Sequence, residues 1–262
     1  MIAGWWRAVV LFTFLAAFAG LLAAATAGLI ELDLQSDAVL IGVGSLKFLF
    51  LALAAAYALA CVKKIPTLGW RLMAAGFAAF AVAQAGLVSY RLVLGISAPF
   101  PSWADLFFIG GSVALMLSLW SFLIEIRRFG SALDLRRRIP LGAALIFGVG
   151  GWLTWSIVSP ILESADNSRE IWLSLVYPLL DLLLLLPSVL LFQVTGPFQG
   201  GQVRRVWATL LVGMALFLVG DLFFSVMKGT VSLWVEWAVD VSYAVGYAVC
   251  ARAFAMHYEM IR

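Results

Sequence analysis

The sequence predicts an all-α, polytopic integral membrane protein with eight transmembrane helices in two four-helix parallel repeats. Its composition is the first indication, because 64% of the 262 residues are hydrophobic and only 12% are charged. Soluble globular chains carry roughly 25% charged residues. The second indication is that apolar runs of about 20 residues, the length that crosses a bilayer, recur along the chain. The third is that the loops between these runs alternate between acidic and basic character.

Taken in order, the apolar runs give eight expected spans. The first is longer than the apolar core of a signal peptide, so we expect it to be retained as a transmembrane helix. The expected spans are residues 8–30, 38–61, 71–94, 103–124, 140–161, 171–194, 206–227 and 234–256.

The distribution of basic residues predicts the orientation. Most of the seventeen Lys and Arg residues fall on one side of the expected topology, as in Lys63, Lys64 and the run Arg136 to Arg138. Cytoplasmic loops carry such an excess, so we expect both termini to be cytoplasmic. Because topology already demands these charges, the net charge of +3 gives no reason to expect nucleic acid as a partner.

The basic connection at residues 125–139 divides the chain into two expected repeats, 1–124 and 140–262. At an offset of 134 or 135, Arg71 aligns with Arg205 and Asp105 aligns with Asp240. An even number of spans in each unit makes such repeats parallel. Apolar helices also align by chance, which leaves an unduplicated chain as the alternative.

Polar side chains within the spans are the candidate ligand-binding residues. A charge at mid-membrane costs about 2.5–3.5 kcal/mol, so each needs a partner or a cavity. In the deduced topology these residues fall in the outer half of the membrane, where inward faces would form an outward-facing acidic pocket. The candidates are Lys47, Gln84, Tyr90, Asp105, Tyr177, Asp181, Asp221, Asp240, Tyr243 and Tyr247.

Several of these residues have a purely structural alternative. Ser102 and Asp105 have the spacing of a helix-capping pair, which accounts for the Asp105 carboxylate without any ligand. Lys47 and Asp181 occupy equivalent positions at an offset of 134, so they are expected to face each other as an ion pair. Asp221 has Lys228 two turns away as an alternative partner.

Enzyme chemistry finds little support in the sequence. His257 is the only histidine, which excludes histidine clusters for haem or zinc. There is no Ser/His/acid set, phosphate loop or metal-spaced cysteine pair, and Cys61 and Cys250 are expected to be buried inert thiols. We therefore expect no catalytic and no metal-binding residues, and the sequence identifies no cofactor.

One stretch carries a family resemblance. Pro101-Ser102-Trp103-Ala104-Asp105-Leu106-Phe107-Phe108 resembles the Pro-Ser-x-Ala-Asp-x-Phe-Tyr signature of bacterial multi-span sensory input modules, which precede GGDEF, EAL or histidine-kinase output domains. Phe108 departs from the tyrosine of that pattern. Elements similar to later parts of the pattern are Tyr177-Pro178-Leu179-Leu180-Asp181, Gly220-Asp221 and Asp240-x-x-Tyr243-x-x-Gly246-Tyr247.

The resemblance covers about residues 70–255 and implies a sensory module of the bacterial inner membrane. The expected partners are the lipid bilayer, a small ligand or cation from the outer side, and a cytoplasmic or membrane signalling protein, since no output domain follows Arg262. A small-solute or ion transporter and an accessory subunit of a larger membrane complex are the alternatives.

Overall fold

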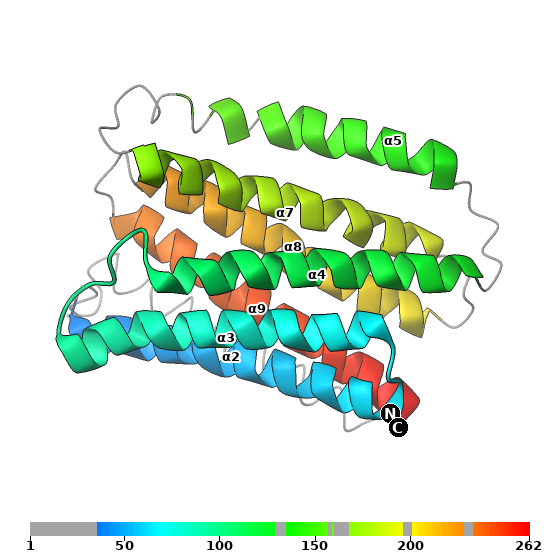
Figure 1. Cartoon of the computed structure of the whole chain (residues 1–262), viewed down its shortest axis with the longest axis horizontal. Coiled ribbons are helices and arrows are strands. Elements are labelled where there is room, and N and C mark those ends of the chain that lie inside the picture. Colours follow the sequence, from blue (N-terminus) through cyan, green and yellow to red (C-terminus); the bar gives the residue numbers. More distant parts are fainter. Residues whose placement is uncertain are drawn as a thin grey trace.

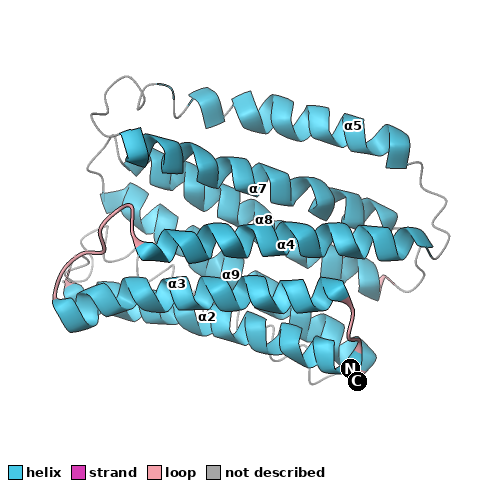
Figure 2. Cartoon of the chain, in the orientation of Figure 1, coloured by secondary structure: helices cyan, strands magenta, loops and turns pink. Residues whose placement is uncertain are grey.

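The structure, a computed structural model, describes residues 36–128, 135–152, 154–156, 159, 168–195, 201–227 and 233–262. Every regular element in these ranges is helical, which confirms the all-α class for this part of the chain (Figure 2). The elements are α2 (Asp37–Lys64), α3 (Leu68–Leu94), α4 (Trp103–Arg128), α5 (Leu135–Leu145), the π-helix η1 (Ile146–Gly150), α7 (Ser168–Val194), α8 (Gln202–Met227) and α9 (Leu233–Ile261).

Five of the described helices are long and apolar enough to cross a membrane. They are α2, α3, α4, the Leu175–Val194 part of α7 and the Gln202–Ser225 part of α8. Large apolar side chains on their outer faces are exposed, for example Leu49, Leu106 and Leu117. Contact with hydrocarbon accounts for such faces, whereas soluble monomers rarely expose large apolar patches. The chain is therefore a multi-pass membrane protein.

The other expected spans have different outcomes. The first, residues 8–30, lies outside the described residues. The fifth corresponds to a shorter apolar helix, Ile139–Gly148, and α5 begins at Leu135, before the expected start at residue 140. The eighth corresponds to α9, which carries Glu236, Asp240 and Arg252 and is not among the five. The total of eight spans and the repeat stay predictions.

Six of the helices that the structure describes form a closed ring. Going round it, α2 packs on α3, α3 on α4, α4 on α7, α7 on α8, α8 on α9, and α9 returns to α2. The helix α5 lies outside the ring against α7 (Figure 1). This ring brings the first and last described helices together, and it encloses the space in which the site lies.

Glycines allow the closest helix crossings of the ring. Gly76 of α3 faces Gly111 of α4, and a Cβ added to Gly111 would lie 2.9 Å from the carbonyl oxygen of Gly76. Gly213 of α8 faces Gly246 of α9 in the same way, at 3.1 Å. Small residues let apolar helices approach closely in membranes, where packing rather than burial from water drives their association.

Candidate functional site

A pocket of about 420 Å³ lies inside the helix ring, beneath the loop that joins α3 to α4. Gly95 ends α3 in a left-handed conformation (φ +64°), from which residues 96–102 return to α4. Every helix of the ring contributes polar side chains to the pocket wall: Lys47, Gln84, Asp105, Tyr177, Asp181, Asp221, Asp240, Tyr243 and Tyr247. Each of these was a candidate from the sequence.

Asp105 joins the start of α4 to α7. The Ser102 backbone N–H donates to Asp105 Oδ2 at 2.6 Å, and the Ser102 hydroxyl lies 3.3 Å from the same oxygen. This is the carboxylate half of a capping box, as the sequence predicts. The Tyr177 hydroxyl donates to the other oxygen, Asp105 Oδ1. Asp105 thus both caps its helix and lines the pocket.

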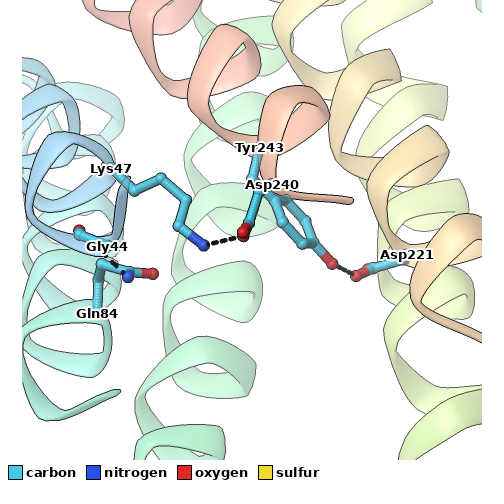
Figure 3. Close-up of polar contacts among 6 residues, drawn as sticks. All are labelled: Gly44, Lys47, Gln84, Asp221, Asp240 and Tyr243. Carbon is cyan, nitrogen blue, oxygen red and sulfur yellow. Dashed lines mark hydrogen bonds and ion pairs between the residues drawn. The ribbon is translucent and has the colours of Figure 1, made fainter. Parts of the chain in front are cut away.

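Lys47 pairs with Asp240, which corrects the expectation that it faces Asp181. Lys47 Nζ lies 2.6 Å from Asp240 Oδ1, and the two side chains are only 13% and 21% exposed (Figure 3). The physical reason is the order of helices in the ring. α9 is a direct neighbour of α2, whereas α7 lies across the ring from it.

Gln84 and Tyr90, the two candidates on α3, end in different places. Gln84 Nε2 donates to the carbonyl oxygen of Gly44 at 3.3 Å, which joins α3 to α2 beside the pocket (Figure 3). Tyr90 does not line the pocket. Six residues turn a helix by about 600°, so Tyr90 points away from the face that carries Gln84.

Asp221 of α8 and Asp181 of α7 are both buried and both line the pocket. The Tyr243 hydroxyl donates to Asp221 Oδ1 (Figure 3). Asp181 is only 5% exposed, and its Oδ2 atom is buried with no hydrogen-bond partner among the described residues. Lys228, the alternative partner for Asp221, lies outside the described residues.

The pocket also contains residues that the sequence reading did not select. Arg91 lines it and pairs with Asp37 at 3.1 Å, and Glu236 lies at the start of α9. Arg91 follows Gln84 by two helical turns and so shares its face, a signal present in the sequence. The aromatic side chains Phe80 and Phe217 also line the pocket, but apolar residues in apolar helices carry no such signal.

Below the pocket the interior of the ring is closed by apolar side chains. Among the most buried are Met73, Phe77, Leu119, Met214 and Phe254. Phe77 packs edge-on against Phe254 with ring centroids 5.1 Å apart. Cys61 and Cys250 are buried free thiols in this layer, as expected. The polar lining therefore ends partway along the ring.

His257 lies near the far end of the ring, one residue beyond the expected last span. Its imidazole packs on Trp70 with ring centroids 4.6 Å apart. Neither ring nitrogen has a hydrogen-bond partner among the described residues. Burial disfavours the charged imidazolium, which lowers the pKa of His257 to about 4. His257 is thus a packing residue here.

Two further findings bear on function. Within the described ranges, no three His, Cys, Asp or Glu side chains gather closely enough to hold a metal ion. In comparisons with protein families, characterised proteins and solved structures, no match to the chain was found. The geometry of the pocket therefore carries the functional argument.

Proposed function

We propose that the protein is a non-enzymatic membrane sensory module that binds a small ligand in the acidic pocket and signals through a partner protein. One observation carries the proposal: every helix of the ring contributes polar side chains to a single pocket of about 420 Å³. A volume of this size suits a small organic molecule. A ligand in this pocket contacts all these helices at once. Its binding can therefore change the relative positions of the helices, including those of their ends on the opposite side.

The proposed orientation places the pocket on the outer side of a bacterial inner membrane. Basic residues end α2 (Lys63 and Lys64) and α4 (Arg127 and Arg128), and Arg204 lies in the first turn of α8. These helix ends lie together, opposite the loop above the pocket (Figure 1). The excess of positive charge on cytoplasmic loops supports this orientation.

The repeat also belongs to the proposal. The glycine crossing of α3 with α4 has a counterpart in the crossing of α8 with α9. The contact of α4 with α7 likewise has a counterpart in that of α9 with α2. A chain made of two parallel units gives such paired contacts, with the pocket between the units.

The closed layer below the pocket favours binding over transport. A transporter needs polar groups along the whole crossing path, whereas Phe77, Phe254 and Met73 fill the ring beneath the pocket. A binding module needs only the pocket and a rigid connection to the opposite helix ends.

Covalent occupation of the pocket tests the proposal without a known ligand. Ser112 lines the pocket and is 6% exposed. A Ser112→Cys variant in lipid nanodiscs is modified with benzyl methanethiosulfonate, and amide hydrogen exchange is followed over residues 252–262 of α9. We expect the exchange at this distant end to change on modification.

The matched control is Gly110→Cys, on the same helix. A Cβ at Gly110 meets nothing within 4 Å, and Gly110 does not line the pocket. Modification there should leave residues 252–262 unchanged. If modification at Ser112→Cys alters exchange only around the pocket, signalling from this pocket is disproved and a scaffolding role takes its place.

A further inference from the structure

Among the described residues, Asp181 Oδ2 is the one carboxylate oxygen of the pocket that is fully buried without a hydrogen-bond partner. Three other carboxylates of the pocket accept from a donor on at least one oxygen: Asp240 from Lys47, Asp105 from Ser102 and Tyr177, and Asp221 from Tyr243. A buried acceptor without a donor is costly, and native structures contain few. Asp181 lines the pocket, so its carboxyl group lies within reach of a bound molecule.

The charges around the pocket favour a cationic ligand. Its two basic side chains are already paired, Lys47 with Asp240 and Arg91 with Asp37. No basic side chain is paired with Asp181 or Asp221 among the described residues. An anion would have to displace an ion pair, whereas a cation would meet carboxyl groups that no basic side chain compensates.

The apolar part of the lining argues for an organic cation rather than a metal ion. Aromatic rings line the same pocket as Asp181 and Asp221: Phe80, Phe108, Tyr177, Phe217, Tyr243 and Tyr247. Ring faces attract cations and also pack against apolar groups. A bare metal ion would leave most of the 420 Å³ unfilled and would lack a cluster of three metal-binding side chains in the described ranges.

We propose that the pocket binds a small protonated amine with an apolar or aromatic body. Its ammonium N–H donates to the Asp181 carboxyl group, and its body packs among the aromatic rings of the lining. The inference rests on the proposed ligand-binding function and narrows it to one class of ligand.

Three probes with the same body but different charge test the inference: 2-phenylethylammonium, 2-phenylethanol and phenylacetate. Thermal unfolding of the full chain in nanodiscs is measured with each probe up to millimolar concentration. We expect the ammonium to raise Tm in a saturable way, and the alcohol and the carboxylate to leave it unchanged. The wild-type comparison needs no variant, so it stands even if a substitution prevents folding.

The variants then locate the contact. Asp181→Asn keeps the shape of the side chain but removes its charge. We expect this variant to bind 2-phenylethylammonium about tenfold or more weakly than the wild type does. Glu259→Gln removes a carboxylate at the opposite end of the ring, where it pairs with Arg252 at 3.8 Å, and should leave binding unchanged. If Asp181→Asn binds the ammonium as tightly as the wild type does, Asp181 is not the residue that holds the ammonium group.

The remaining outcomes separate this inference from the proposed function. Equal shifts by the alcohol or the carboxylate would overturn the cationic class while leaving a ligand-binding pocket. Absence of any shift by the ammonium would overturn the inference too. The hydrogen-exchange experiment on Ser112→Cys uses no amine, so it decides the signalling proposal independently.

Discussion

Lys47 of α2 and Asp240 of α9 form an ion pair inside the helix ring, and each charge is compensated by the other. Their contact of 2.6 Å is largely shielded, with side chains 13% and 21% exposed. Removing one partner of a buried pair leaves an uncompensated charge. We therefore expect Lys47→Met to lower the unfolding free energy by about 3 kcal/mol. Unfolding in mixed micelles measures this change.

The double variant gives the control for that prediction. With Asp240→Asn added to Lys47→Met, no unpaired charge remains, so stability should recover in part. The expected coupling is about 1–3 kcal/mol, as for residues in direct contact. Strictly additive effects of the two substitutions would show that the ion pair contributes nothing beyond its separate side chains.

His257 predicts a dependence of stability on pH. Its pKa is about 4 in the folded protein against 6.5 for an exposed imidazole. Between these values the unfolded chain binds a proton that the folded chain does not. The contribution of His257 to the free energy of unfolding is therefore fully present above pH 6.5. It is lost as the pH falls toward 4, by at most about 1.4 kcal/mol per pH unit.

The variant His257→Phe tests this prediction, because it keeps an aromatic ring against Trp70 but cannot ionise. Tm is measured for both proteins over the same pH range. We expect the fall in Tm between pH 6.5 and pH 4 to be smaller in the variant. Parallel curves for the two proteins would assign the acid sensitivity to other groups.

At the scale of the helices, the crossing of α3 with α4 depends on the absence of a side chain at Gly111. A Cβ there would lie 2.5 Å from Phe80 Cδ1 and 2.9 Å from the Gly76 carbonyl oxygen. The second atom belongs to the backbone and cannot turn aside. We expect Gly111→Ala to destabilise the protein by about 1–3 kcal/mol, which thermal unfolding in nanodiscs would detect.

The neighbouring glycine is a matched control. Gly110 has nothing within 4 Å of an added Cβ, so Gly110→Ala meets no obstacle. Alanine also favours a helix over glycine by about 1 kcal/mol, so this variant should be neutral or slightly more stable. Equal destabilisation by both substitutions would mean that the close approach of α3 and α4 does not limit stability.

At the scale of the whole molecule, the sequence predicts the helices and most of the pocket, because both follow from the membrane. Long apolar runs must be helical there, since backbone groups in hydrocarbon have no water to bond. Charged side chains avoid lipid, so Asp181, Asp221 and Asp240 were expected to face inward. All the candidate site residues except Tyr90 line the pocket.

The contacts between helices could not be predicted in the same way. Helical periodicity assigns a residue to a face but does not say which helix lies opposite. The expected pair of Lys47 with Asp181 assumed that α2 and α7 are neighbours. In the ring these two helices lie opposite each other, and α9 brings Asp240 to Lys47 instead. The aromatic lining was missed because Phe80 and Phe217 look like any other core residue.

The sidedness of the ring gives the last prediction. Ser97 lies in the loop above the pocket and Lys64 at the opposite end of α2, and both are exposed. In intact cells, a membrane-impermeant maleimide should label Ser97→Cys and leave Lys64→Cys unlabelled. In inverted vesicles the pattern should reverse.

The native cysteines do not interfere with this experiment, because Cys61 and Cys250 are buried. The reverse pattern would place the pocket on the cytoplasmic side, so its ligand would be an intracellular one. Labelling of both positions in intact cells would mean that the chain inserts in two orientations. The prediction depends on the asymmetry of Lys and Arg between the two sides of the membrane. Insertion in both orientations would therefore show that the basic helix ends do not fix the topology.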